Sequence, residues 1–125
     1  MYCHGVLAVA SGVSDVAVAS EIEVLARFGR ALADPIRCRI LLALRAAPAY
    51  PADLAEALGV SRTRLSNHLA CLRDCGLVVT VPDGRRTRYE LADERLGHAL
   101  YDLRTAVVAV EAVRTCVGVD EKGCC

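Results

Sequence analysis

The segment PADLAEALGVSRTRLSNHLACLRDCG (residues 51–76) constrains the fold more than any other part of this chain. It begins with a short amphipathic helix pattern that stops at Gly59, a residue type that commonly ends helices. Ser61 then provides an N-cap for a second helix, which we expect to run to Gly76. Two helices joined by so short a turn predict a helix-turn-helix.

The segments on either side extend this unit. LVVTVPDGRRTRYEL (residues 77–91) contains an apolar run, an Asp-Gly turn and a second alternating run, which together predict a β-hairpin. Upstream, residues 21–33 have apolar positions at helical spacing, and Asp34 followed by Pro35 predicts the start of another helix. The expected fold is therefore a winged helix-turn-helix that is mainly α with a small β-hairpin.

From Asp93 onward the chain is expected to return to helix, with apolar residues at spacings of four and three. These residues are Leu96, Leu100, Leu103, Val107 and Val110. So long an apolar stripe favours packing against a second copy and hence a homodimer, although it could instead cover the domain's own core. We expect a flexible N-terminal arm at 1–20, a DNA-binding and dimerisation domain at 21–115, and a flexible cysteine-containing tail at 116–125.

The composition restricts the possible functions. The 15 basic and 15 acidic residues balance, so any DNA binding has to come from local charge. No run approaches the roughly 20 apolar residues of a membrane span, and the N-terminus is a poor signal peptide, which with seven cysteines favours a cytoplasmic protein with reduced thiols and no membrane partner. No set of nucleophile, base and oxyanion donors is visible, so we expect neither an enzyme nor a protein substrate.

One face of the second helix of this pair is suited to DNA. At about 100° per residue, the side opposite the leucines is small, polar and free of acids, and Asn67 could pair with adenine while Arg62 pairs with guanine or phosphate. Arginines at the hairpin tip could reach phosphates or the minor groove. The predicted DNA-binding residues are Arg62, Thr63, Ser66, Asn67, Arg85, Arg86 and Arg88. The alternative is an ordinary solvated face and a charged turn.

Cys71 and Cys75 lie one helical turn apart, about 6 Å along the axis, on a third stripe beside the core and away from this face. Two thiolates at this spacing suit one soft ion, such as Zn(II), Cu(I), Cd(II), Pb(II) or As(III). A third ligand is needed, and Cys116 is the obvious candidate. The alternative is that both are small buried hydrophobic residues. Cys38 is expected to belong to the core, and His68 to have a structural role.

Three segments, LARFGRALADPIRCRILLAL, LGVSRTRLSNHLACLRDCGLV and GRRTRYELAD, resemble the ArsR/SmtB family of metal-sensing winged-helix repressors over roughly residues 24–117. NHLACLRDCGL together with TCVGV is similar to the cadmium and lead sensors of that family. The resemblance implies a dimer in which Cys71, Cys75 and Cys116 bind the ion as a trithiolate, with the third thiol reaching across from the partner.

The resemblance also implies a function. Such a homodimer would bind double-stranded operator DNA without metal and release it when Cd(II) or Pb(II) binds, which turns on a metal efflux or detoxification operon. Several alternatives stay open: a repressor that responds to As(III), Sb(III) or Zn(II), a thiol redox switch acting through Cys71, and a metal carrier with no DNA role. The family's other zinc site is poorly supported, because His98 and Asp102 lie one turn apart but no second histidine follows.

Overall fold

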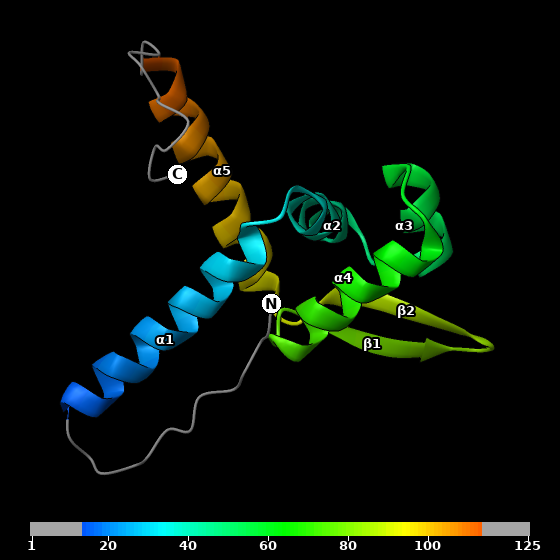
Figure 1. Ribbon diagram of the computed structural model, residues 1–125, viewed down its shortest axis with the longest axis horizontal. Coiled ribbons are helices and arrows are strands. Elements are labelled where there is room, and N and C mark those ends of the chain that lie inside the picture. The colour runs from blue at the N-terminus through cyan, green and yellow to red at the C-terminus, as the bar shows by residue number, and fades with distance from the viewer. Residues whose placement is uncertain (1–13, 114–125) are drawn as a thin grey trace.

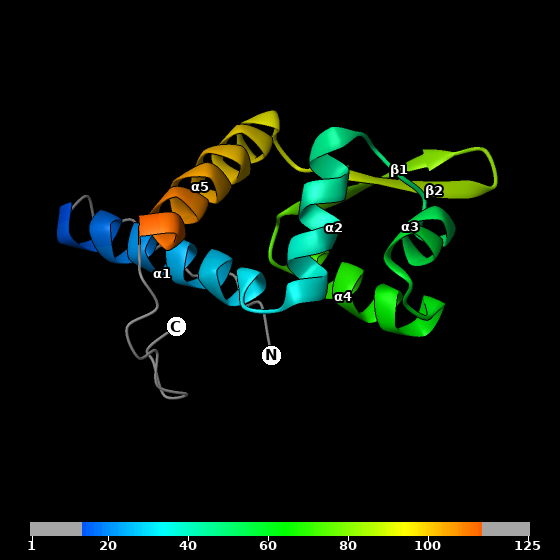
Figure 2. The same cartoon turned by 90° about the horizontal axis from the view of Figure 1, so that it is seen from above.

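The computed structural model describes residues 14–113 as five helices and one antiparallel hairpin (Figure 1). In chain order they are α1 (Ser14–Leu32), α2 (Pro35–Ala46), α3 (Pro51–Leu58), α4 (Arg62–Asp74), β1 (Val78–Asp83), β2 (Arg86–Leu91) and α5 (Glu94–Val113). The helices α2, α3 and α4 pack with the hairpin, whereas α1 and α5 project from the opposite end of the domain (Figures 1 and 2). The predicted winged helix-turn-helix is confirmed.

The start of α1 differs from the prediction. Residues 14–20 were expected to belong to a flexible arm, but the helix begins at Ser14, so that part of the prediction was wrong. The segment SDVAVAS has no apolar period and gave no amphipathic signal, yet alanine is the strongest helix former and Ser and Asp favour helix starts. Residues 1–13 and the predicted tail at 116–125 lie outside the described residues.

The predicted helix caps are present. Asp34 Oδ1 accepts hydrogen bonds from the backbone N–H groups of Ile36 (2.8 Å) and Arg37 (3.1 Å) at the start of α2. Ser61 Oγ accepts one from Arg64 N (3.1 Å) at the start of α4. Gly59 ends α3 with a φ of 67°, a left-handed conformation that is strained for residues with a side chain.

The end of α4 lies at Asp74, two residues before the predicted Gly76. Gly76 N donates to Arg73 O (2.9 Å) and Leu77 N donates to Leu72 O (3.0 Å). With Gly76 at a φ of 79°, this pair of bonds forms a Schellman motif, in which the chain reverses and satisfies the last carbonyls of the helix. Cys75 is therefore the C-cap residue and Leu77 leads directly into β1.

The hairpin is held against the helices at its base. Its register pairs Val78 with Leu91 and Asp83 with Arg86, which leaves a two-residue loop whose first position is Gly84. Tyr89 in β2 exchanges two backbone hydrogen bonds with Ala49 in the α2–α3 connection, at 2.8 and 3.0 Å. The base of the wing is thereby fixed to the helix-turn-helix while its tip extends outward.

The core is formed mainly by one face of α4 against α2, α3 and the first strand. Leu65, Leu69 and Leu72 are fully buried on α4. The predicted apolar stripe of α5 divides into two parts: Leu96 and Leu100 pack on this core, whereas the later residues are exposed. Those exposed residues are Leu103, Val107 and Val110, between 45% and 64% exposed. Among the described residues, no helix is long and apolar enough to span a membrane.

Candidate nucleic-acid interface and metal centre

The predicted DNA-reading residues of α4 lie together on its exposed side. Arg62, Thr63, Ser66 and Asn67 are all exposed. Thr63, Ser66 and Asn67 face away from the buried leucines, whereas Arg62 flanks the leucine side at the start of the helix. The first turn of α4 contains no acidic residue. Their placement agrees with the helical geometry expected from the sequence, and their contact with DNA stays a prediction.

The arginines of the hairpin have different surroundings. Arg85 is exposed and forms no hydrogen bond or ion pair with any other residue in the described part of the chain. Arg86 stacks on Tyr50, with its Cζ 3.5 Å from the ring centroid, and its Nη2 lies 3.4 Å from Asp53 Oδ2. Arg86 is therefore held in place by residues at the start of α3.

Arg88 is the least available of the three. It is half-buried, with Nη1 at 3.6 Å from Asp83 Oδ2 and Nε at 3.5 Å from Glu90 Oε2. Two carboxylates next to one guanidinium neutralise its charge inside the hairpin. Among the predicted DNA contacts, Arg88 is thus the one with the weakest structural support.

Sequence reasoning missed the residues that position Arg86. The hydroxyl of Tyr50 donates a hydrogen bond to the Asp83 carboxylate, and this bond is the main reason why the pKa of Tyr50 is raised. Tyr50 and Asp83 are 33 residues apart in the chain, as are Asp53 and Arg86. No local pattern in the sequence could have paired them.

The two thiols of α4 lie on the flank that faces the core. Cys71 is half-buried, Cys75 is 5% exposed, and Cys75 N donates to Cys71 O at 2.9 Å, one helical turn away. The sulfur of Cys75 is engaged in a disulfide, so its use as a metal ligand requires that bond to be reduced. Within residues 14–113, no group of three His, Cys, Asp or Glu side chains could hold a metal, and Cys116 lies outside this range. The trithiolate therefore stays a prediction.

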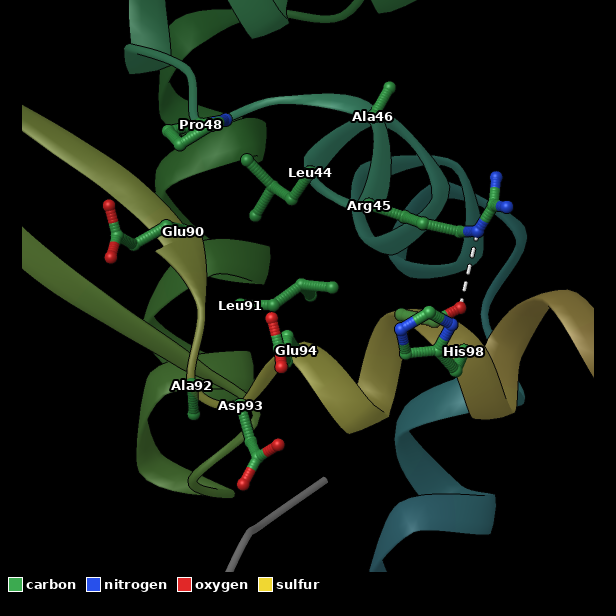
Figure 3. Close-up of a pocket in the computed structure, with 11 residues that line it drawn as sticks. Leu44, Arg45, Ala46, Pro48, Glu90, Leu91, Ala92, Asp93, Glu94 and His98 are labelled. Atoms are coloured by element: carbon green, nitrogen blue, oxygen red, sulfur yellow. Dashed lines mark hydrogen bonds between the residues drawn. The ribbon is translucent and has the colours of Figure 1, made fainter.

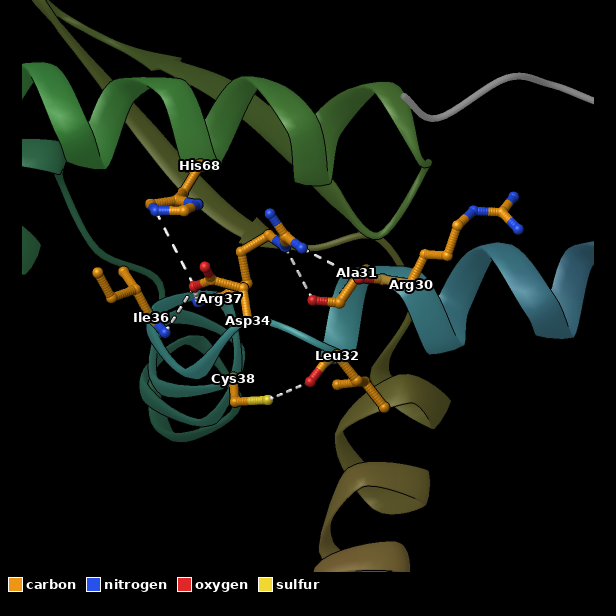
Figure 4. Close-up of polar contacts among 8 residues, drawn as sticks. All are labelled: Arg30, Ala31, Leu32, Asp34, Ile36, Arg37, Cys38 and His68. Atoms are coloured by element: carbon orange, nitrogen blue, oxygen red, sulfur yellow. Dashed lines mark hydrogen bonds and ion pairs between the residues drawn. The ribbon is translucent and has the colours of Figure 1, made fainter. Parts of the chain in front are cut away.

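His68 lies next to Asp34, at the junction of α1 and α2 (Figure 4). Its Nε2 is 3.9 Å from Asp34 Oδ1, which supports the predicted structural role. Cys38 is half-buried at the same junction and its Sγ donates to Leu32 O at 3.0 Å. Burial, with a contribution from the nearby Asp34 carboxylate, raises the pKa of the Cys38 thiol, which favours the neutral form.

A buried arginine at this junction was not predicted. Arg37 is only 8% exposed, and its guanidinium donates to Ala31 O at 2.9 Å and to Arg30 O at 3.0 Å (Figure 4). These carbonyls belong to the last turn of α1, where backbone acceptors have no partner within the helix and a cation is favourable. Arg37 thus fixes the angle between α1 and α2.

A pocket of about 750 Å³ lies between the ends of α2 and β2 and the start of α5 (Figure 3). Arg45 shapes it, because its Nε donates to Gly97 O at 3.2 Å and its guanidinium lies 4.6 Å from the Tyr101 ring centroid. The pocket contains His98 and three carboxylates but no cysteine, and its acids form no metal-binding group with other described residues. The structure therefore adds no support for a histidine-carboxylate zinc site on α5.

The architecture and the exposed, acid-free face of α4 define a winged helix-turn-helix regulator. Residues 34–80 match the family described as "Bacterial regulatory protein, arsR family". The chain is 56% identical over 93 residues to the HTH-type transcriptional regulator CmtR of Mycobacterium tuberculosis, a match that covers 74% of this chain and 79% of CmtR. The chain therefore belongs to the arsR family of bacterial transcriptional regulators, which are not enzymes.

Solved structures agree with this assignment. The NMR structure of the cadmium metal-sensor CmtR from Mycobacterium tuberculosis superposes with a TM-score of 0.58 at 50% identity, over 80% of this chain and 95% of that one. A homodimeric winged helix-turn-helix DNA-binding domain from Mycobacterium bovis, described as a possible ArsR-family transcriptional regulator, superposes with a TM-score of 0.66 at 32% identity, over 74% of this chain and 84% of that one.

Proposed function

We propose that this protein is a metal-responsive transcriptional repressor that binds operator DNA as a homodimer without metal and releases it when Cd(II) or Pb(II) binds cysteine thiolates. Release would turn on a metal efflux or detoxification operon in the cytoplasm. One observation carries the proposal: Cys71 lies on the helix that also carries the exposed Ser66 and Asn67, and Cys75 is the C-cap residue of that helix. A ligand bound by these thiols acts directly on the DNA-facing element.

The chemistry of the donors fits a soft ion. Cys71 and Cys75 project from one flank of α4 a single turn apart, a spacing that lets two thiolates share one ion. Cys116, from the same or the partner protomer, would supply the third thiolate. The 56% identity to CmtR, whose solved structure is described as that of a cadmium metal-sensor, supports this choice of ion.

Coupling to DNA follows from the position of the thiols. Cys75 is buried at the C-cap of α4. If the third thiolate comes from another segment, metal binding pulls the C-terminal end of α4 towards that segment. The three core leucines hold α4 as one rigid element, so a displacement at its end also moves its DNA-facing side. Allosteric coupling free energies of this kind are typically about 1 to 3 kcal/mol, or roughly 5- to 150-fold in affinity.

The dimer is supported by the apolar surface of the two projecting helices. On α1, Ile22, Val24 and Leu25 are 46% to 68% exposed, and α5 adds the exposed apolar residues of its later turns. Several exposed large apolar residues on two neighbouring helices favour an interaction site. A second copy would cover it and place two α4 helices about one turn of DNA apart, roughly 34 Å.

The test is fluorescence anisotropy of the reduced protein on a labelled duplex from the region upstream of its own gene. Cd(II), Pb(II), Zn(II) and arsenite are titrated against the wild type, Cys71→Ser, Cys116→Ser and, as a matched thiol control, Cys38→Ser. We expect Cd(II) or Pb(II) to release DNA from the wild type and from Cys38→Ser but not from the other two. If Cd(II) releases DNA from Cys71→Ser and Cys116→Ser at the same metal concentrations that release it from the wild type, the trithiolate is refuted.

Two alternatives remain and the same assay separates them. Three thiolates also suit As(III) or Sb(III), and release by arsenite alone would identify that repressor. The disulfide at Cys75 favours a thiol redox switch as a second candidate. A switch of that kind predicts that mild peroxide, without metal, lowers DNA affinity in step with a disulfide detected by mass spectrometry.

A further inference from the structure

A pocket of about 310 Å³ opens where the start of α3, the start of α4 and the tip of the hairpin meet. Three arginines from two of these elements line it, namely Arg62 of α4 and Arg85 and Arg86 of the hairpin. Tyr50 and Thr87 also line it, and none of the lining residues is acidic. In a chain whose charges balance overall, three guanidinium groups around one small cavity form a local site for an anion.

The three arginines are not equivalent. Within residues 14–113, Arg62 and Arg85 have no hydrogen-bonded or ion-paired partner, so their charges are available. Arg86 is stacked on the Tyr50 ring and paired with the Asp53 carboxylate at 3.4 Å. The Asp53 side chain is 65% exposed and that of Arg86 is 53% exposed, so water screens this ion pair and it is weak.

The stacking partner of Arg86 is itself held in place. The Tyr50 hydroxyl donates to Asp83, the last residue of β1, which fixes the ring between the hairpin and α3. The guanidinium of Arg86 can therefore exchange one anionic partner for another while its stack on the ring is kept. Ala52, in the first turn of α3, also lines the pocket, where the positive end of the helix dipole adds to the attraction.

We propose that this pocket binds one phosphodiester of the operator backbone through Arg62, Arg85 and Arg86, and that the Asp53 carboxylate pairs with Arg86 until that phosphate displaces it. The inference rests on the proposed DNA binding and adds the location of one phosphate contact and an internal competitor for it. Asp53 then lowers the affinity of the repressor for DNA. Removing its charge is expected to tighten binding rather than weaken it.

The experiment measures the operator affinity of the reduced, metal-free protein by anisotropy for the wild type, Asp53→Asn, Arg86→Gln and the double variant. Glu56→Gln is the matched control, because it removes one exposed negative charge from the same helix, whereas the acid paired with Arg86 is Asp53. We expect Asp53→Asn to tighten binding by up to about fivefold, the range of one exposed ion pair. Glu56→Gln should change affinity by less than half of that factor, and Asp53→Asn should add nothing once Arg86 is Gln.

A second measurement tests the phosphate contact directly. Arg86→Gln is expected to reduce the slope of log affinity against log salt concentration by about 1, as for the loss of one phosphate contact. On duplexes with single neutral methylphosphonates, one position in each half-site should weaken the wild type, and it should weaken Arg86→Gln by a smaller factor, because Arg62 and Arg85 still contact that phosphate. Circular dichroism melting of each variant verifies that the fold is retained.

The outcomes separate the two proposals. If the wild type binds the duplex and metal releases it, but Asp53→Asn behaves like Glu56→Gln or keeps its gain in the Arg86→Gln background, the pocket proposal is wrong and the repressor proposal stands. If the wild type does not bind the duplex at all, both are wrong.

Discussion

Asp34 Oδ1 lies 3.9 Å from His68 Nε2 while it accepts the backbone hydrogen bonds that start α2 (Figure 4). One carboxylate thereby connects the N-terminus of a core helix to α4, the helix that carries the predicted DNA contacts. His68 precedes Cys71 by about one turn on α4, so this contact lies close to the thiols along that helix. Changes at Asp34 are therefore expected to affect stability first.

Asp34→Ala should lower the free energy of unfolding by about 1 kcal/mol, the usual cost of losing a helix N-cap. Asp34→Asn keeps a side-chain oxygen at the cap and should lose clearly less. Urea denaturation followed by circular dichroism at a fixed protein concentration measures both. Equal losses for Ala and Asn would show that the carboxylate acts through charge and not through the cap.

Acid should destabilise the fold through two aspartates. For Asp34, burial alone would raise the pKa, but the N–H bonds from Arg37 and Ile36 and the nearby positive charges outweigh it and lower the pKa. For Asp93, hydrogen bonds from the Arg95 side chain and backbone lower the pKa to about 2. A carboxyl group whose pKa is lower in the folded state stabilises the fold above its unfolded pKa of about 4, and that contribution is lost as pH falls through the folded value.

The measurement is urea denaturation at pH 6, 4 and 3. The difference in stability between the wild type and Asp93→Asn, or Asp34→Asn, should shrink as pH falls below about 4. A difference that stays constant over this range would mean that the two carboxyl groups have the same pKa in the folded and unfolded chains.

Arg37→Met should lower the free energy of unfolding by about 2 kcal/mol, because it removes charged hydrogen bonds to the last carbonyls of α1. Arg39→Met, at an exposed site on the same helix, should change stability by less than about 0.5 kcal/mol. Thermal or urea denaturation compares the two. Similar losses at both positions would mean that the guanidinium of Arg37 contributes no more than a surface arginine.

Val107→Glu should convert the proposed homodimer to monomer and weaken operator binding, because it places a charge in the exposed apolar face of α5. Ala109→Glu is the control, since it adds the same charge about 160° away around the helix. Sedimentation velocity reports the oligomeric state of both variants. A dimer that survives Val107→Glu would require the interface to lie elsewhere.

The sequence predicted those parts of the fold that depend on local interactions. Each of these features involves residues close together in the chain, so the sequence alone predicts it. They are the caps at Asp34 and Ser61, the helix end at Gly59 and the hairpin loop. The start of α1 was missed because residues 14–20 contain helix-forming alanines but have no apolar period, so the segment has helix propensity without an amphipathic signal.

The candidate site was predictable only in part, for a physical reason. Helical geometry placed Asn67 on the exposed face of α4 and Cys71 on its core-facing flank. The ring under Arg86 and the acid beside it come from Tyr50 and Asp53, which tertiary packing brings to the hairpin from more than thirty residues away. The neutralisation of Arg88 likewise depends on cross-strand register, which fixes its neighbours only after the hairpin closes.

The Schellman motif at the end of α4 makes Gly76 and Leu77 the whole connection between that helix and the wing. Cys75, directly before them, therefore lies at a pivot, with the recognition helix on one side and a hairpin of about 20 Å on the other. A rotation of about 5° at such a point displaces the far end of a 20 Å arm by about 2 Å, more than half the length of a hydrogen bond. A ligand held at this pivot would thus displace α4 and the arginines at the wing tip with a single small movement.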